Sequence, residues 1–249
     1  ARNICDCFKG GIALQIYVSA SVKRSGDGSQ AAPFQTINEA AQVAVAGDEV
    51  IVLPGYYREW VDPKNGGTAD DCRITYRSQV PGGAVITGSE VVKTWEPYQG
   101  DVWVARIPNG LFGNSKPFHT GEVYLNGKSM YEAEDLEGVL QPQEYKSSWD
   151  RAFTIYRWYT CQEDGNTVLY ANFHGANPNE ENVEINVRRN CFYPSKTGVN
   201  YITLSGFVVR QAATQWAPPT AYQEGMIGPH WSKGWIIEDC EVSDSKCSG

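Results

Sequence analysis

Two short stretches near the C-terminus decide the fold: "TLSGFVVRQ", residues 203–211, and "IIEDCEVSD", residues 236–244. They superpose with a shift of 33 residues, from 203 to 236. In each stretch an inward apolar residue is followed by a one-residue bend and two further inward positions. The shift therefore aligns three pairs: Leu204 with Ile237, Gly206 with Asp239, and Val209 with Val242.

This unit is typical of a coil of a parallel β-helix, in which each coil buries one face against the next. Gly206 and Asp239 suit the bend because Gly and Asp accept left-handed backbone angles. Residues 212–233, which contain prolines, separate the two units. We expect them to form a long excursion from one side of the coil.

The N-terminal third has the same alternation of short strands and turns. Thr36 and Glu39 have the T-x-x-E spacing of a capping box and Gly47 suits a C′ position, which predicts a helix over residues 37–46. Short apolar runs bounded by Pro and Gly then predict three strands. These strands are expected at residues 50–53, 72–78 and 84–89.

The middle region has the alternating pattern of antiparallel strands, in "DVWVARI", "EVYLNGKSMYE", "FTIYRWYT" and "VEINVRR". Asn126-Gly127 and Asp164-Gly165 are hairpin-turn signals. Because coil-like sequence stands on both sides, we interpret this region as an inserted β-sandwich. The expected domains are a cap with the first coils (1–89), the sandwich (90–195) and resumed coils (196–249). The alternative is one irregular β domain.

Composition limits the partners. The chain has 249 residues, 29 acidic against 21 basic residues and a net charge of -8 without a basic run, which argues against nucleic acid and anionic membranes. No apolar run approaches the roughly 18 residues of a spanning helix, and the start lacks the order of a signal peptide, which favours the cytoplasm. Seven scattered cysteines and three histidines predict free buried thiols and no metal site.

Three strings carry a resemblance to a known family: "AGDEVIVLPGYYREWVDPKNGGTADDCRITY", "ANFHGANPNEENVEINVRRNCFYP" and "QWAPPTAYQEGMIGPHWSKGWIIEDCEVSDSKCSG". From about residue 17 to residue 249 the chain resembles the N-terminal part of glycoside hydrolase family 120, the β-xylosidases. The resemblance implies a right-handed parallel β-helix interrupted by a jelly-roll sandwich. The first 15 or so residues do not share it.

The resemblance also implies a function in xylan degradation: removal of xylose from xylo-oligosaccharides with retention of configuration and without a cofactor. The family's two catalytic carboxylates lie beyond the position of Gly249. The chain is therefore expected to be an N-terminal fragment, inactive alone, whose catalytic residues are unknown from this sequence. The expected partner is a xylo-oligosaccharide or a related neutral glycan. A homo-oligomer is left open.

The excursion supplies the candidate sugar-binding residues. Trp216, His230 and Trp231 offer flat apolar faces and hydrogen-bonding edges on a loop between coils. Buried aromatics that only pin the loop are the alternative, and Trp235 is expected in the core. The carboxylates of residues 132–137 are expected to be a solvated charged stretch, and those of residues 238–241 are expected to have a structural role. Two other functions stay open: a non-catalytic carbohydrate-binding β-helix, and a polysaccharide lyase on the same scaffold.

Overall fold

The computed structural model describes residues 14–112, 120–214, 217–247 and 249. The chain divides into two compact units, Ala1–Gly88 with Arg189–Gly249, and Ser89–Arg188. Both are built mainly from β-strands, since the two α-helices of the described residues are short: α1 (Ile37–Val43) and α2 (Leu136–Leu140). The predicted all-β class is therefore confirmed.

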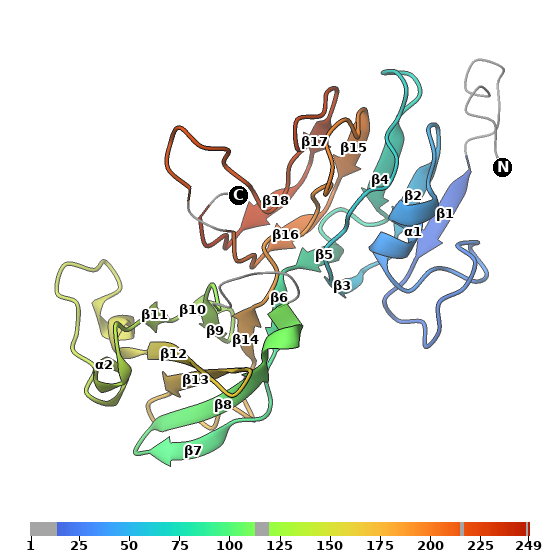
Figure 1. The fold of residues 1–249 in the computed structure, drawn as a ribbon. Coiled ribbons are helices and arrows are strands. Elements are labelled where there is room, and N and C mark those ends of the chain that lie inside the picture. Colours follow the sequence, from blue (N-terminus) through green and yellow to red (C-terminus); the bar gives the residue numbers. More distant parts are fainter. Residues whose placement is uncertain (1–13, 113–119, 215–216, 248) are drawn as a thin grey trace. The chain divides into compact units, whose positions relative to one another are not determined.

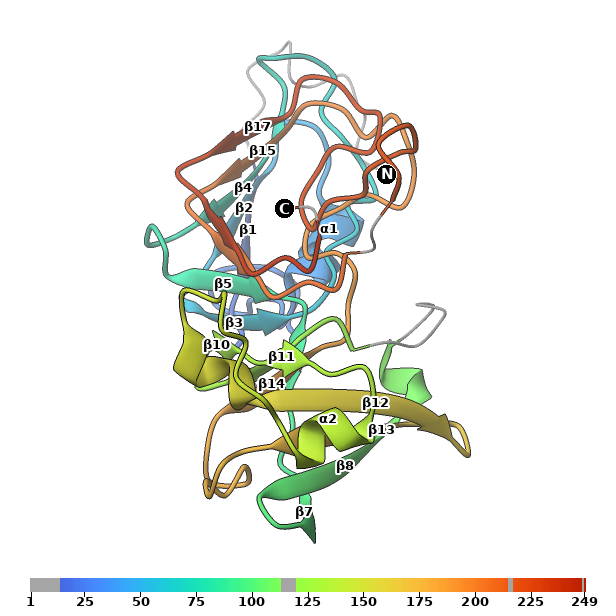
Figure 2. The same cartoon turned by 90° about the vertical axis from the view of Figure 1, so that its left-hand side faces the viewer.

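The first unit contains two parallel sheets; its first two strands share one sheet, and the later strands alternate between the two (Figures 1 and 2). The five-stranded sheet has its strands in chain order: β1 (Gln15–Val18), β2 (Glu49–Val52), β4 (Ile74–Ser78), β15 (Ile202–Ser205) and β17 (Ile236–Glu238). The four-stranded sheet likewise follows chain order: β3 (Gly55–Arg58), β5 (Ala84–Thr87), β16 (Val208–Arg210) and β18 (Glu241–Ser243). Isolated parallel bridges join Val61 to Phe192 and Phe192 to Ile227 on a third side.

Paired positions stack apolar side chains across the strands of the first unit. One such ladder crosses the five-stranded sheet and consists of Ile16, Val50, Tyr76, Leu204 and Ile237. A second crosses the four-stranded sheet and consists of Tyr57, Ile86, Val209 and Val242. Every member is buried except the last of each ladder, Ile237 at 44% exposed and Val242 at 39%. The apolar side chains of both ladders are therefore buried except on the last strands, β17 and β18, where they are exposed to solvent.

The register predicted from sequence is confirmed, because Leu204 pairs with Ile237 and Val209 with Val242. Both predicted bends also have left-handed angles, with φ of 76° at Gly206 and 52° at Asp239. The bend lets the chain pass from one parallel sheet to the other without interrupting either ladder.

Helix α1 starts as predicted but ends earlier than residue 46. Thr36 Oγ1 accepts the N–H of Glu39 at 3.2 Å, and Glu39 Oε2 accepts the N–H of Thr36 at 2.9 Å, which completes the capping box. The helix ends at Val43 because the Asp48 carboxylate accepts the N–H of Val45 at 3.0 Å and holds a turn instead. Gly47, with φ of 93°, belongs to this turn and not to the helix end.

The second unit consists of two largely antiparallel sheets that enclose one apolar core with Trp158 fully buried. The first sheet contains β10 (Lys128–Ser129), β9 (Val123–Leu125), β14 (Val183–Asn186) and β6 (Ser89–Val91). The second contains β11 (Tyr131–Glu132), β12 (Arg157–Glu163), β13 (Asn166–Asn172), β8 (Val102–Pro108) and β7 (Glu96–Gln99). Two 3-10 helices complete the unit, η2 (Asn109–Phe112) and η3 (Arg151–Ile155).

Both predicted hairpin turns are present. Asn126 and Gly127 have φ of 52° and 81°, and Asp164 and Gly165 have 47° and 78°, as a two-residue type I′ turn requires. The strand expected over "FTIYRWYT" is partly wrong. Residues 153–155 belong to η3, because the Thr154 hydroxyl donates to the carbonyl of Arg151 at 2.6 Å and the N–H of Phe153 to that of Asp150 at 3.1 Å.

The cysteines differ in part from the expectation of free buried thiols. Cys191 is free and buried, as expected. Cys72, in contrast, is disulfide-bonded, and Cys247 is free but exposed. The position of a cysteine in the sequence carries no signal of its distance from another cysteine in space, which is what decides pairing.

Replacing Gly206 tests the left-handed bend. A Cβ on Gly206 would meet its nearest atoms at 3.6 Å, an ordinary contact, so the cost of a side chain there comes from the backbone angle alone. We expect Gly206→Ala to lower the free energy of unfolding by about 1–2 kcal/mol. Gly206→Asn should cost clearly less, because Asn tolerates left-handed angles. Equal losses for both in urea unfolding would contradict this explanation.

Replacing Thr36 tests the capping box. Thr36→Ala leaves the N–H of Glu39 without its acceptor and should lower the free energy of unfolding by about 1 kcal/mol. Thr36→Ser keeps the hydroxyl and serves as the matched control. Denaturant unfolding followed by circular dichroism measures both variants, and an unchanged midpoint for Thr36→Ala would show that the cap contributes no stability.

Candidate functional site

A cavity of about 410 Å³ in the first unit is the candidate site. It is formed by the segment after Phe192 and by the excursion that leads from β16 to β17. Its lining is aromatic and polar, and comprises Tyr193, Tyr222, Gln223, Gly225, Ile227, Gly228, Pro229, His230, Trp231, Ser232 and Gly249. Its volume falls within the range of small-molecule sites, roughly 300–1,000 Å³.

The third side of the first unit holds this cavity in place. The N–H groups of Cys191 and Phe192 both donate to the carbonyl of Met226, at 2.8 and 3.1 Å, and the N–H of Gly228 donates back to Phe192 at 3.2 Å. A Cβ on Gly228 would come within 3.1 Å of the Tyr193 ring. Glycine at this position therefore lets the ring pack directly on the backbone.

The residues that carry His230 and Trp231 form a strained turn. Both have left-handed angles, with φ of 47° and 58°. The N–H of Ser232 closes the turn by donating to the carbonyl of Pro229 at 3.1 Å, and the N–H of Lys233 donates to Asn200 Oδ1 at 2.9 Å. Two successive non-glycine residues with these angles cost free energy, and such strain is common where side chains must be presented in one orientation.

Four rings are arranged in a row from the interior to the surface. Tyr193 stacks on His230 with centroids 5.4 Å apart, His230 faces Tyr222 at 5.8 Å, and Tyr222 stacks on Trp231 at 5.4 Å. The planes within each pair are within about 34° of parallel. Tyr193 is 4% exposed, whereas Trp231 is 73% exposed. The row therefore offers apolar faces at the opening of the cavity.

The polar groups around the rings include one that is fixed by a hydrogen bond and two that have no hydrogen-bond partner among the described residues. The Nδ1 atom of His230 lies 2.7 Å from the carbonyl of Pro194, and a carbonyl only accepts, so Nδ1 carries a proton and the neutral ring has its acceptor at Nε2. Tyr193 Oη and Ser232 Oγ are buried without a hydrogen-bond partner among the described residues. Desolvation, reinforced by the negative charge of Glu224, raises the pKa of Tyr222. The cavity thus combines hydroxyl donors, an imidazole acceptor and ring faces.

Among the described residues, no Asp or Glu lines this cavity. Retaining glycoside hydrolysis needs two carboxyl groups about 5–5.5 Å apart. The cavity can therefore bind a polyhydroxylated ligand, but it does not contain the groups that would cleave one.

Two of the three predicted sugar-binding residues lie at the cavity. The structure brings His230 and Trp231 together in the cavity, whereas Trp216 lies outside the described residues. Trp235 is partly buried in the core, as expected, with its indole N–H donating to the carbonyl of Val199 at 2.7 Å. Tyr193 was missed, because it lies 37 positions before His230 (230 minus 193) and only the bridge between Phe192 and Ile227 in the folded chain brings the two rings together.

The two carboxylate groups of the sequence analysis, residues 132–137 and 238–241, do not line the cavity. Asp135 caps α2 by accepting the N–H of Gly138 at 2.9 Å. Asp239 forms the bend described above, and Glu238 and Glu241 are exposed. No group of three or more metal-ligating side chains occurs in the described part of the chain. Asp27, in the "SGDGS" stretch, accepts the N–H of Ser29 at 3.0 Å in a surface turn.

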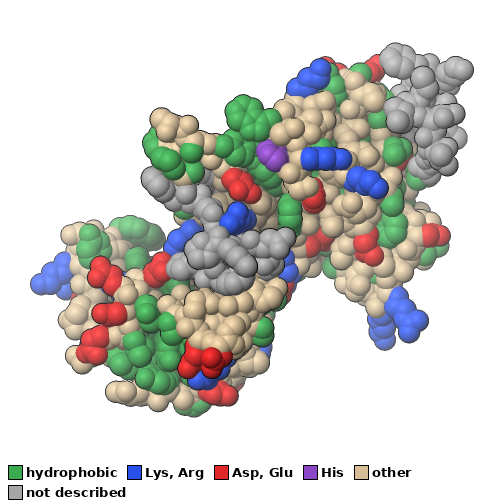
Figure 3. Space-filling model, viewed as in Figure 1, with side chains coloured by type: hydrophobic (Ala, Val, Ile, Leu, Met, Phe, Trp, Pro, Cys, Tyr) green, Lys and Arg blue, Asp and Glu red, His purple; other side chains and the backbone are tan. Residues whose placement is uncertain are grey.

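The surface also has a second cavity and charges of both signs. A larger cavity of about 590 Å³ beside β1 is lined mainly by apolar side chains, including Leu14, Ile16 and Phe34, and brings no set of reactive groups together. Acidic and basic side chains are interspersed on the visible face (Figure 3). No helix in the described ranges has the length and apolar character needed to cross a membrane.

Comparison with known proteins gives a consistent set of relatives. Residues 116–185 match the model of the glycoside hydrolase 120 insertion domain. The solved complex of XylC with xylose is 44% identical, with a TM-score of 0.86 over 93% of this chain and 40% of that one. The uncharacterized protein YwoF of Bacillus subtilis (strain 168) is 36% identical over 76 residues, which are 30% of this chain and 16% of that protein.

A second solved structure, a glycoside hydrolase 13% identical with a TM-score of 0.51, covers 80% of this chain and 51% of that one and is similar in fold alone. The chain spans less than half the length of XylC and about one sixth of YwoF. The insertion-domain match lies within the second unit, where sequence analysis expected an inserted domain. The chain is therefore similar to glycoside hydrolase family 120 through its insertion domain, and to XylC over nearly its whole length.

Proposed function

We propose that this chain is the N-terminal part of a retaining β-xylosidase that releases xylose from the ends of xylo-oligosaccharides. The first unit is a stretch of right-handed parallel β-helix, and the second is a jelly-roll-like sandwich inserted into it. The domains proposed from the sequence, residues 1–89, 90–195 and 196–249, differ from these units mainly at the second boundary, which lies between Arg188 and Arg189 in the structure. Strands that alternate between two parallel sheets in chain order support this architecture.

The observation that carries the proposal is the aromatic cavity in a chain 44% identical to a protein solved with xylose. A sugar ring has apolar C–H faces and a rim of hydroxyl groups. The rings of Tyr222 and Trp231 match the faces, and His230 Nε2 with the Tyr193 and Ser232 hydroxyls matches the rim. The cavity accordingly forms part of a sugar-binding surface.

Cleavage requires carboxylates that this stretch does not place at the cavity, so the nucleophile and the acid/base lie on later coils of a longer polypeptide. The open ladders support this extension, because Ile237 and Val242 would be covered by a further coil. The match to only 40% of XylC agrees with it. No cofactor is required, because the two carboxylates carry out the reaction.

A non-catalytic carbohydrate-binding protein is the second candidate. The cavity without an Asp or Glu side chain among the described residues favours it, since binding needs only the rings and hydroxyl groups. The two candidates differ in the residues that follow Gly249 and in turnover, but they share the cavity as the sugar-binding site.

Removing the ring of Trp231 tests the cavity. Trp231→Asn takes away the stacking face while tolerating the left-handed backbone angle, so it removes the ring without adding strain. We expect xylobiose binding, measured by calorimetry, to weaken about tenfold. Tyr56→Ala removes an exposed ring of β3 outside the cavity and should leave the affinity unchanged. Equal affinities for wild type and Trp231→Asn would exclude the cavity as the binding site.

Turnover tests the position of the catalytic groups. Nitrophenyl xyloside should be hydrolysed by a polypeptide extended beyond Gly249 and not by residues 1–249 alone. Hydrolysis by the 249-residue chain would refute the placement of both carboxylates on later coils. Binding without turnover by the extended polypeptide would favour the carbohydrate-binding alternative.

A further inference from the structure

The loop between α2 and η3, residues 141–150, presents two large aromatic side chains to solvent. Trp149 is 94% exposed, the most exposed large hydrophobic side chain among the described residues, and Tyr145 is 60% exposed. Neither belongs to the cavity in the first unit. An exposed tryptophan is costly to hydrate and is enriched where a surface binds a partner.

A tight turn holds the two aromatic residues close together. The N–H of Ser148 donates to the carbonyl of Tyr145 at 3.0 Å, which is the hydrogen bond of a β-turn from its first to its fourth residue. Trp149 follows at once. The Cα atoms of Tyr145 and Trp149 are therefore within about 11 Å of each other, since a β-turn spans less than about 7 Å and the next Cα adds 3.8 Å.

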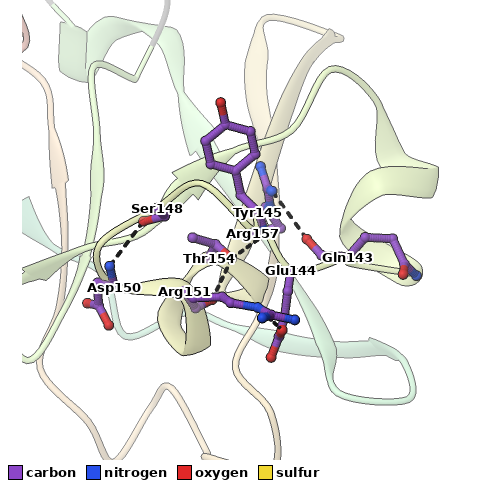
Figure 4. Close-up of polar contacts among 8 residues, drawn as sticks. All are labelled: Gln143, Glu144, Tyr145, Ser148, Asp150, Arg151, Thr154 and Arg157. Atoms are coloured by element: carbon purple, nitrogen blue, oxygen red, sulfur yellow. Dashed lines mark hydrogen bonds and ion pairs between the residues drawn. The ribbon is translucent and has the colours of Figure 1, made fainter.

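The turn is fixed by the structure beneath it (Figure 4). The N–H of Tyr145 donates to the hydroxyl of Thr154 at 2.8 Å, and Thr154 is fully buried. Glu144 pairs with Arg151 at 2.5 Å, and the N–H of Asp150 donates to Ser148 Oγ at 3.2 Å. Because these contacts pre-order the loop, a ligand that binds the two rings would pay little conformational entropy.

The charges around the turn are paired within the protein. Besides the Glu144–Arg151 pair, Asp150 forms an ion pair with Lys128, whose ammonium also lies 3.9 Å from the centre of the Phe153 ring. The Arg157 guanidinium donates to the carbonyl of Gln143 at 3.5 Å. Lys146, inside the turn, adds one positive charge. What the loop offers a partner is mainly two rings together with amide and hydroxyl groups, which is chemistry suited to a neutral glycan.

We propose that Tyr145 and Trp149 form a binding site for a xylan chain on the second unit, in addition to the sugar cavity of the first unit. The nature of the ligand rests on the proposed function. Two rings on one rigid turn would stack on separate residues of the same polymer chain, so the site favours a long chain over a disaccharide. A second attachment point would raise the effective concentration of the polymer at the protein.

Affinity electrophoresis of the 249-residue chain in gels with soluble xylan tests this site. We expect Trp149→Ala to raise the apparent dissociation constant at least about tenfold and Tyr145→Ala to raise it less. Trp149→Phe should retain most of the retardation because it keeps a ring face, whereas Trp149→Leu should not. Tyr98→Ala, which removes another exposed ring of the same unit, is the matched control and should behave as wild type.

The outcomes separate this site from the cavity. Unchanged retardation of Trp149→Ala, with xylobiose binding still lost in Trp231→Asn, would overturn the second site and leave the cavity intact. A wild-type chain that binds neither xylan nor xylobiose would overturn both. A fall in molar mass of Trp149→Ala in light scattering, without a change in xylan retardation, would show that a second copy of the chain covers Trp149 and would also overturn the proposal.

Discussion

Parallel, in-register stacking of short strands is the constraint on which the first unit depends. Each strand satisfies its backbone groups on its neighbours, and each inward side chain packs on the residue at the same position of the adjacent strand. Val50, Tyr76 and Leu204 illustrate this, since the three are paired in succession and fully buried. A shift of one residue would turn the inward side chains outward, so the buried face specifies the register.

The same stacking builds the cavity. Tyr193 and His230 are far apart in the sequence, and the parallel bridge between Phe192 and Ile227 sets their backbone segments side by side. The excursion can be long and irregular because both of its ends are fixed in parallel sheets, one by β16 in the four-stranded sheet and the other by β17 in the five-stranded sheet. The strained angles of His230 and Trp231 are sustained by hydrogen bonds from the fixed segments, including that from Lys233 to Asn200.

Sequence predicted what local patterns determine. The repeat of Leu204 and Ile237, the bends at Gly206 and Asp239, and the hairpin at Asn126-Gly127 each follow from backbone preference or apolar spacing. The patterns failed where a tertiary contact decides. Asp48 ends α1 early, and Thr154 holds residues 153–155 in a 3-10 helix. The residues next to Tyr193 in the sequence do not predict its place in the cavity, and those next to Trp149 do not predict its exposure.

In the proposed β-helix, the residues of the cavity and the catalytic carboxylates would lie on different coils. Each coil of such a stack contacts only its neighbours, so the aromatic row would be complete once the segments that carry Tyr193 and Trp231 are in place. Carboxylates on later coils would need further strands laid on β17 and β18, where Ile237 and Val242 present the apolar ends of both ladders. Under the proposed function, sugar recognition at the cavity would therefore depend on different residues from cleavage, and the two could be gained or lost independently.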